Sequence, residues 1–165
     1  MSLCLKRQSI RNFNQDPIDD EIIEKLLKSA MQAPSARNQQ PWEFYVIKNR
    51  DVLHQLAQVS NGARHLEKAP LAILTLMQED TPAPLMCSQD LSAATQNILL
   101  EATNLGLGSL WIGLYPIEER IENVKNTIDL KDSLTPFSLI ALGYPSSPHK
   151  DKPLRYDASR VTVIE

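Results

Sequence analysis

Residues 90–113 read DLSAATQNILLEATNLGLGSLWIG, and this stretch combines a helix signal with a strand signal. Apolar residues recur at helical spacing over residues 90–105 and define a wide apolar face, and Gly106 is suited to end the helix. The following run, residues 109–114, has strand character. We therefore expect a long helix that leads directly into a strand, with its apolar face buried in the core or at a subunit interface.

Helix and strand patterns alternate on both sides of this stretch. Apolar residues at helical spacing predict an amphipathic helix over residues 19–33, with Pro17 ahead of it and Asp19 or Asp20 available as its N-cap. The other patterns predict, in chain order, a strand over 43–48, a short helix over 51–59, a buried strand over 71–77, a loop over 78–84, a helix over 117–127 and a strand over 137–142. The tail from Ser146 is polar and punctuated by prolines, so we expect it to wrap the surface.

The alternation contains no glycine-rich dinucleotide fingerprint, no internal repeat and no linker. It therefore predicts one three-layer α+β domain over residues 1–165. The chain is 42% hydrophobic and 22% charged, which is ordinary for a globular domain with a buried core. Its net charge is −3 and its lysines and arginines are scattered, which argues against nucleic acid as a partner.

The chain lacks segments typical of secretion or of membrane insertion. No basic start is followed by a long apolar run, and no apolar stretch approaches the roughly 20 residues of a membrane helix, so we expect a cytoplasmic protein with no membrane partner.

Cys4 and Cys87 are too few for a disulfide framework and are expected to be free thiols. His54, His65 and His149 stand apart from any triad or metal pattern, so we expect them to be solvated or structural and no metal to be bound.

Four polar clusters could together bind an anionic, planar ligand. In the first, residues 7–11 (RQSIR), Arg7 and Arg11 flank the Ser9 hydroxyl and could give charge-assisted hydrogen bonds to phosphate or to ring oxygens. An ordinary charged N-terminal segment is the alternative. In the second, the loop 34–42 (PSARNQQPW), Ser and Asn side chains can pair with a ligand while the prolines hold the backbone.

The other two clusters lie in the second half of the chain. Residues 106–113 (GLGSLWIG) contain glycines that would let a flat ring approach the main chain closely, although tight packing explains the pattern equally well. Residues 150–156 (KDKPLRY) could close a phosphate site with Lys152 or Arg155, and the alternative is a solvated tail.

Taken in order, these clusters resemble the nitroreductase family of flavoproteins over nearly the whole chain. Residues 7–11 look like the family's Arg-Arg-Ser-x-Arg segment, with Gln8 in place of the common second basic residue. Residues 33–42 match the family's Ala-Pro-Ser-x-x-Asn-x-Gln-Pro-Trp pattern in full. Further resemblance lies in the central helix and following strand (Asp90, 93–94, 96–97 and 105–113) and in the closing segment (142–145 and 152–157).

The resemblance implies a three-layer α/β/α fold with a central mixed, mostly antiparallel sheet, and a homodimer with FMN sites at its interface. Arg7 and Ser9 would hold the FMN phosphate or ribityl, Arg11 the pyrimidine edge of the flavin, and Arg155 the phosphate. The loop 33–42 would reach the FMN bound mainly by the other subunit. The cofactor-binding residues implied in this way are Arg7, Gln8, Ser9, Arg11, Pro34, Ser35, Ala36, Asn38, Gln40, Ile112, Gly113, Lys152 and Arg155.

The same resemblance implies an FMN-dependent oxidoreductase. Hydride would pass from NADH or NADPH through FMN to a small oxidised acceptor, a nitroaromatic or a quinone, in ping-pong order. No catalytic side chain is expected, because the flavin N5 carries the chemistry. The alternatives are reductive dehalogenation or another flavin reaction on the same scaffold, and a flavin-binding sensor or carrier with little turnover. A helical interaction module without cofactor would leave the ordered polar clusters unexplained.

Overall fold

The computed structural model describes residues 2–148 and 152–165. Its centre is a four-stranded sheet of order β1-β2-β4-β3 in which neighbouring strands are antiparallel. The strands are β1 (Trp42–Ile47), β2 (Leu71–Gln78), β3 (Gly108–Gly113) and β4 (Leu134–Gly143). An isolated parallel bridge joins Ser9 to Ser109 at the β3 edge. The expected α+β fold with a mostly antiparallel sheet is therefore confirmed, although the four strands pair in antiparallel fashion only and the parallel bridge lies outside them.

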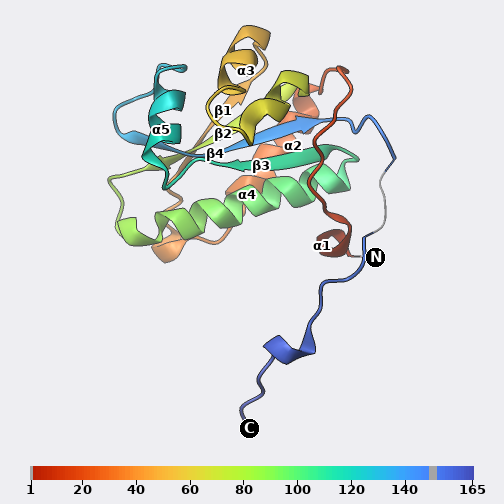
Figure 1. The fold of residues 1–165 in the computed structure, drawn as a ribbon. Coiled ribbons are helices and arrows are strands. Elements are labelled where there is room, and N and C mark those ends of the chain that lie inside the picture. Colours follow the sequence, from red (N-terminus) through yellow and green to blue (C-terminus); the bar gives the residue numbers. More distant parts are fainter. Residues whose placement is uncertain (1, 149–151) are drawn as a thin grey trace.

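Helices cover both faces of the sheet, which makes the three layers that the sequence predicts (Figure 1). On one face α2 (Asp20–Met31) packs against α4 (Cys87–Asn104). The other face carries α3 (Arg50–Leu56), the 3-10 turn η2 (Ala63–Lys68) and α5 (Glu118–Lys125). The short elements that remain are α1 (Leu3–Lys6), η1 (Ala36–Asn38), η3 (Pro84–Met86) and η4 (Ala158–Arg160).

Strand β2 shows why this sheet needs helices on both sides. Its side chains alternate, with Ile73 in the core beneath α2 and α4, and with Ala72 and Leu74 in the core beneath α3 and α5. Both sets are apolar, so neither face can meet water. This is the reason that the sequence of β2 is a continuous apolar run rather than an alternating one.

The long helix α4 has the predicted apolar face, and the structure shows what this face packs against. Leu91, Ala94, Ile98 and Ala102 are buried in the core that α4 shares with α2 and the sheet. These residues of the face therefore pack within their own chain, as the core alternative predicts. The helix begins at Cys87, three residues before the start expected at Asp90, because η3 leads straight into its first turn.

The other predicted elements are confirmed with shifted ends. Strand β4 begins at Leu134 rather than Phe137, since Pro136 lies at a bulge where the register with β2 shifts between Thr75 and Leu76. Proline is tolerated in a strand at such a bulge, whereas the sequence pattern alone treats it as a strand boundary. Helix α3 is shorter than expected and is capped by the Asn49 side chain, which accepts hydrogen bonds from two backbone N–H groups.

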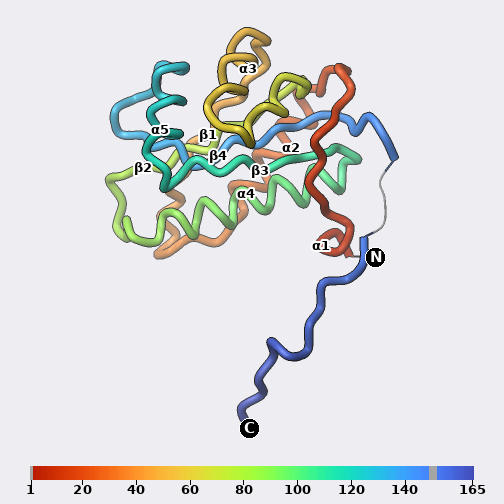
Figure 2. The backbone as a smooth tube through the Cα atoms, viewed as in Figure 1, coloured from red at the N-terminus to blue at the C-terminus, as the bar shows by residue number. Residues whose placement is uncertain are grey.

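The tail differs from its prediction. Every residue over 152–165 is exposed, and Figure 2 shows this segment leaving the body of the protein instead of wrapping its surface. The tail carries apolar side chains that find no groove in their own chain, among them Leu154, Val161 and Ile164. Within the described residues, no helix has the length and apolar character needed to cross a membrane.

Candidate functional site

The N-terminal cluster lies along the edge strand β3. Ile10 donates its backbone N–H to the carbonyl oxygen of Ser109 at 2.9 Å, next to the Ser9–Ser109 bridge. Further along, Asn14 donates to the carbonyl oxygen of Tyr144 at 2.8 Å. The first and third polar clusters of the sequence are thus brought together. Gln8 is buried there, Arg7 and Ser9 are half-buried and Arg11 is exposed.

The three glycines of the third cluster have three different roles. Gly106 has a φ of 76° and ends α4, with the N–H of Leu107 bonded back to the carbonyl of Ala102 at 2.8 Å. At Gly108 a Cβ would lie 2.7 Å from Cγ2 of Ile10, so this glycine admits the N-terminal segment rather than a ligand. At Gly113 a Cβ would meet nothing within 4 Å. Gly106 also has open space at its Cβ position, but its positive φ and its place at the end of α4 account for it, so Gly113 is the glycine of β3 that borders open space.

The main chain of β3 is also available at that end. Because the Ser109 carbonyl faces the N-terminal segment, alternation along an antiparallel strand turns the groups of Ile112 toward β4 and those of Gly113 toward the open edge. The Gly113 carbonyl accepts a hydrogen bond from Nη1 of Arg120 at 2.8 Å. Of the two residues that the resemblance points to, Gly113 therefore turns its backbone groups to the open edge, whereas the Ile112 side chain is buried in the core.

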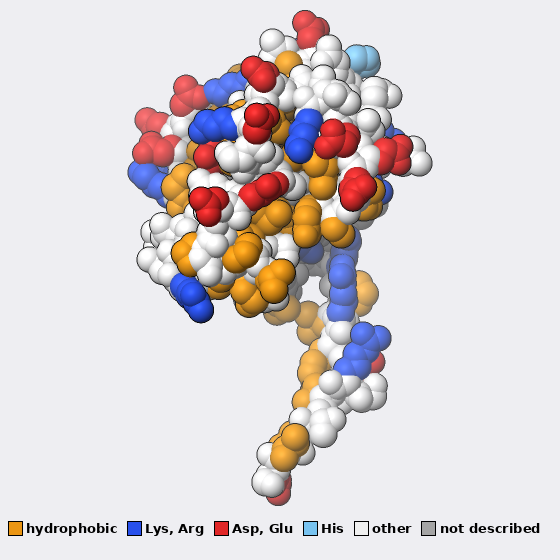
Figure 3. Space-filling view, turned by 90° about the vertical axis from the view of Figure 1, so that its left-hand side faces the viewer, with side chains coloured by type: hydrophobic (Ala, Val, Ile, Leu, Met, Phe, Trp, Pro, Cys, Tyr) orange, Lys and Arg blue, Asp and Glu red, His pale blue; other side chains and the backbone are white. Residues whose placement is uncertain are grey.

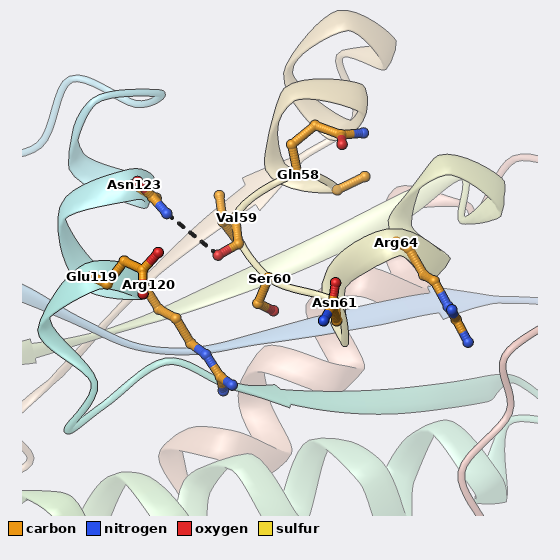
Figure 4. A pocket seen from close by; sticks show the side chains of 9 residues that line it. Gln58, Val59, Ser60, Asn61, Arg64, Glu119, Arg120 and Asn123 are labelled. Carbon is orange, nitrogen blue, oxygen red and sulfur yellow. Dashed lines mark hydrogen bonds between the residues drawn. The ribbon is translucent and has the colours of Figure 1, made fainter.

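A polar cavity of about 420 Å³ opens beside this edge, between η2 and α5. Its volume is in the range of small-molecule sites. Figure 4 shows Asn61 and Arg64 on one side and Arg120 and Asn123 on the other, with the side chains of both arginines extending toward β3. Asn123 fixes the two walls to each other by donating to the carbonyl of Val59 at 3.5 Å.

Two arginines, Arg64 and Arg120, and one acidic residue, Glu119, line this cavity, and further positive charges lie around His65 near Arg64. The pKa of His65 lies below its ordinary value, chiefly because the imidazole is partly buried, and the charges of Arg64, Arg11 and Lys68 add to the effect. A backbone hydrogen bond with Arg11 acts in the opposite direction. Arg11 and Arg64, 53 positions apart in the sequence, both contribute to this shift and so lie near the same imidazole. An electron-rich edge of a ligand would be stabilised there.

Sequence reasoning missed Asn61, Arg64 and Arg120 as site residues. They belong to a turn and a helix whose patterns describe only local structure, and none of them is part of a recognisable motif. The one signal that could have found the first two is the polar Ser60-Asn61-Gly62 turn placed shortly before a buried strand, where binding groups are common. The Ser60 hydroxyl oxygen is buried and has no hydrogen-bond partner within the described structure.

The second cluster lies at the opposite end of α4. The backbone N–H of Ala36 donates to Oδ1 of Asp90 at 3.0 Å, which fixes the loop 34–41 to the first turn of the helix. The N-terminal cluster lies beyond the last turn, and at 1.5 Å per residue the two ends of the 18-residue α4 are roughly 27 Å apart. Ser35 and Ala36 are half-buried, and Pro34, Asn38 and Gln40 are exposed. One chain therefore does not bring this loop to the Ser9–Ser109 end of β3.

The fourth cluster stands apart as well. Lys152 and Arg155 lie on the exposed tail, and Figure 3 shows basic and hydrophobic side chains along it, clear of the body. Lys150, Asp151 and His149 lie outside the described residues. Two of the four clusters, the first and the third, thus form one site within the chain, and the other two are separate from it.

The chemistry of this site fits a planar, electron-rich ligand that also carries an anionic group. A backbone N–H at Gly113 and the amide of Asn61 can bond carbonyl or nitrogen acceptors of a ring. The arginines supply charge-assisted hydrogen bonds to oxygen atoms. No general base or nucleophile of the described residues lines the cavity in an arrangement that performs catalysis alone. Binding and orientation are what this arrangement can do.

Comparisons with known proteins agree with this fit. The profile of the Nitroreductase family matches residues 4–88 and 63–144. A protein of Archaeoglobus fulgidus, provisionally named NADH dehydrogenase/NAD(P)H nitroreductase, is 42% identical over 164 residues, covering 96% of this chain and 92% of the relative. The crystal structure of a protein from Clostridium acetobutylicum, provisionally named NADH oxidase, aligns with a TM-score of 0.96 at 44% identity over 99% of both chains. A Desulfovibrio desulfuricans protein, provisionally named a nitroreductase and solved in complex with FMN, aligns with a TM-score of 0.85 at 26% identity over 99% of this chain and 95% of the other.

Proposed function

Because the chain belongs to the nitroreductase family, we propose that the open edge of β3 holds the ring of FMN and that the protein passes hydride from NAD(P)H to a small nitroaromatic or quinone. The protein is an NAD(P)H-dependent oxidoreductase, and FMN is its cofactor. When bound, FMN supplies the hydride chemistry through N5, which explains why no nucleophile or triad is needed. The observation that carries the proposal is the open, positively charged edge at Gly113, with Arg64 and Arg120 beside it.

The residues at this edge would hold and orient FMN. Arg7 and Ser9 lie at the Gly108 end of β3, where they would bind the phosphate or ribityl. Arg11 and Arg64 would face the pyrimidine carbonyls, where a positive charge stabilises the charge that the ring gains on reduction. The Gly113 N–H would meet N5 or O4. Arg120 holds the Gly113 carbonyl and so keeps that N–H in place.

We propose that two such sites form across the interface of a homodimer. The loop 34–41 lies at the first turn of α4, whereas the Ser9–Ser109 bridge lies beyond its last turn, so the length of α4, roughly 27 Å, separates them within one chain. A two-fold axis that sets the α4 helices of two chains antiparallel would bring the loop of each chain to the β3 edge of the other. Ser35, Asn38 and Gln40 would then complete the partner's FMN site. The exposed tail would do the same with Lys152 and Arg155.

The cytoplasm is the compartment that we propose for the protein. Cys4 is an exposed thiol and Cys87 is buried, and both are free cysteines. Reduced thiols are typical of the cytosol, where the pyridine nucleotide reductant would also be met.

The first experiment is to purify the protein without added cofactor, record its visible spectrum and identify any released chromophore by chromatography. One FMN per chain is the expected result. A colourless protein that also takes up no added FMN would contradict the proposal and leave the interaction-module alternative.

Initial rates would then test the order of the reaction. NADH or NADPH and the acceptor would use the same exposed face of the ring in turn, so double-reciprocal plots should give parallel lines. Lines that cross would contradict the ping-pong order. An acceptor panel of nitroaromatics, quinones and halogenated phenols separates the proposed activity from reductive dehalogenation, and negligible nicotinamide oxidation with FMN bound would indicate a sensor or carrier.

A further inference from the structure

The loop over residues 34–40 has an unusual backbone. Arg37, Asn38 and Gln40 have φ values of 53°, 53° and 48°. This left-handed region disfavours residues with a Cβ, and of these three only asparagine visits it readily. Three such residues within four positions persist only where the surroundings fix them. The question is therefore which groups hold the loop in this shape.

The carboxylate of Asp90 binds the loop on both sides of the left-handed pair. Oδ1 accepts the backbone N–H of Ala36 at 3.0 Å, and Oδ2 accepts Nε2 of Gln39 at 2.7 Å. Asp90 is 5% exposed and lies in the first turn of α4, whose other buried residues are mainly apolar. A buried carboxylate with both oxygens bound to one loop fixes that loop to a rigid helix.

Gln39 extends this connection to a third segment. Its Oε1 accepts the backbone N–H of Ala83 at 2.8 Å, and its Nε2 donates to the carbonyl oxygen of Ala83 at 3.1 Å. Within the loop, the Ser35 hydroxyl accepts the N–H of Gln40 at 3.0 Å. The amide of Gln39 thus joins the loop, the start of α4 and the segment before η3 through directional hydrogen bonds.

We propose that Asp90 is a positioning residue for FMN. Through Ala36 and Gln39 it holds the loop in the left-handed shape that presents Ser35 and Asn38 to the cofactor. Because the loop reaches the partner's site, Asp90 of each chain sets the FMN affinity of the other chain's site. The inference rests on the proposed function, and it adds a residue that does not itself touch the cofactor.

A purely structural role for Asp90 is the competing explanation, since an acidic residue in the first turn also stabilises a helix through its dipole. The two explanations differ in where a substitution acts. Asp90→Asn keeps the size of the side chain but sets an NH₂ group against one of the loop donors. Loss of the positioning contact would loosen residues 33–42 selectively, whereas loss of helix stability would loosen α4 and its neighbours as well.

The first measurement is amide hydrogen exchange of the full-length protein after removal of flavin. In Asp90→Asn and in Gln39→Ala, exchange of a peptide covering 33–42 should be about tenfold faster or more, because a buried hydrogen-bond partner has been lost. A peptide from the middle of α4 should be unchanged and serves as the internal control, because loss of helix stability would make it exchange faster as well. Glu101→Gln, at the far end of α4, is the matched variant, because Glu101 accepts hydrogen bonds from nearby Asn104 and not from the loop.

The second measurement is titration of the same proteins with FMN, well below their melting temperatures. The dissociation constant of Asp90→Asn and of Gln39→Ala should rise about tenfold or more, and that of Glu101→Gln should match the wild type. The double variant Asp90→Asn/Gln39→Glu exchanges amide for carboxylate, so Ala36, residue 90, residue 39 and the Ala83 N–H can pair again. It should recover most of the affinity, although it lacks the acidic group in the helix.

The outcomes separate the two proposals. Loop exchange and FMN affinity unchanged in Asp90→Asn, or a folded double variant that recovers neither, would overturn the positioning role while leaving FMN binding intact. A wild-type protein that binds no FMN, with loop exchange still faster in the variants, would overturn the proposed function together with the role in FMN affinity. If Asp90→Asn fails to fold, Gln39→Ala tests the positioning role instead. Gln39 is half-buried in a loop, so its substitution should leave the fold intact.

Discussion

The two ends of the chain look alike in the sequence and differ in the structure. Each carries arginines that the family resemblance directs to FMN, in residues 7–11 and in residues 152–157. The N-terminal segment is fixed to β3 by the Ser9–Ser109 bridge and by a glycine that leaves room for Ile10. The tail is exposed along its whole described length, over 152–165. The difference shows that the chain fixes its N-terminal segment at the β3 edge and offers its tail no surface to pack on.

The largest effect is expected from removing residues 153–165. Burying two of the tail's apolar side chains against a partner would contribute about 1.5–3 kcal/mol each, so the truncated protein should dimerise a hundredfold or more weakly. Sedimentation should show monomers, and FMN occupancy should fall with dimerisation. Stability of the monomer itself should hardly change, because the tail packs on nothing in its own chain. A truncated protein that remains a full dimer would show that the tail does not hold the two chains together.

A substitution at Gly108 tests the N-terminal end. In Gly108→Ala the new Cβ would overlap Ile10, so the N-terminal segment must move, at a cost of about 1–3 kcal/mol of unfolding free energy and with loss of FMN affinity. Gly113→Ala is the control, since its Cβ enters open space. It should leave the melting temperature unchanged and weaken FMN binding alone. Equal melting temperatures for the two variants would show that the segment is not fixed at Gly108.

A smaller effect, on the midpoint potential of bound FMN, should distinguish Arg11 at the N-terminal end from Arg155 in the tail. Arg11→Ala removes a positive charge from the ring edge and should lower the midpoint potential of bound FMN by tens of millivolts, corresponding to roughly 1–2 kcal/mol for a two-electron couple. Arg155→Ala should weaken FMN binding and leave the potential unchanged, because the phosphate is remote from the ring. Redox titration of both variants gives the answer. An unchanged potential in Arg11→Ala would contradict its assignment to the ring.

The smallest effect concerns His65, which lies beside Arg11. Its pKa in the folded protein is below the ordinary value of 6.5, so the unfolded chain binds a proton more readily than the folded protein does. Its contribution to stability is therefore present above pH 6.5 and is lost as the pH falls through the folded pKa. Chemical denaturation of His65→Gln between pH 7.5 and pH 5 should show a shallower fall in stability than the wild type. Identical pH profiles would mean that Arg11 and Arg64 do not act on this imidazole.

Much of the fold could be predicted because its elements carry strong local patterns. The helices α2 and α4 and the strand β2 follow from the spacing of apolar residues, and their ends shift by a few residues at most. The pattern fails where a local rule is overridden by a neighbour. Pro136 lies inside β4 because β4 is bulged there, with Phe137 as the extra residue opposite Thr75 and Leu76 of β2, and that partner strand is some 60 positions away in the sequence.

In the candidate site, too, some residues could be predicted from local motifs and others only from the tertiary structure. The motifs of residues 7–11 and 33–42 give the family and, through it, FMN, because they record chemistry that a local segment carries. No motif identifies Asn61, Arg64 and Arg120. They become site residues only because η2 and α5 face each other beside the edge of β3. Asp90 is similar, since its two loop contacts span 51 to 54 positions.

The sequence by itself determined the order of helices and strands, the family and the kind of cofactor, since periodicity and short motifs are properties of neighbouring residues. Only the tertiary structure decided what each of three glycines does: Gly106 ends a helix, Gly108 admits Ile10 and Gly113 borders open space. It also decided that the apolar face of α4 is core and that the tail stands free of its own chain. All of these features depend on contacts between segments that are remote in the sequence. Packing determines such contacts, and local sequence patterns do not predict them.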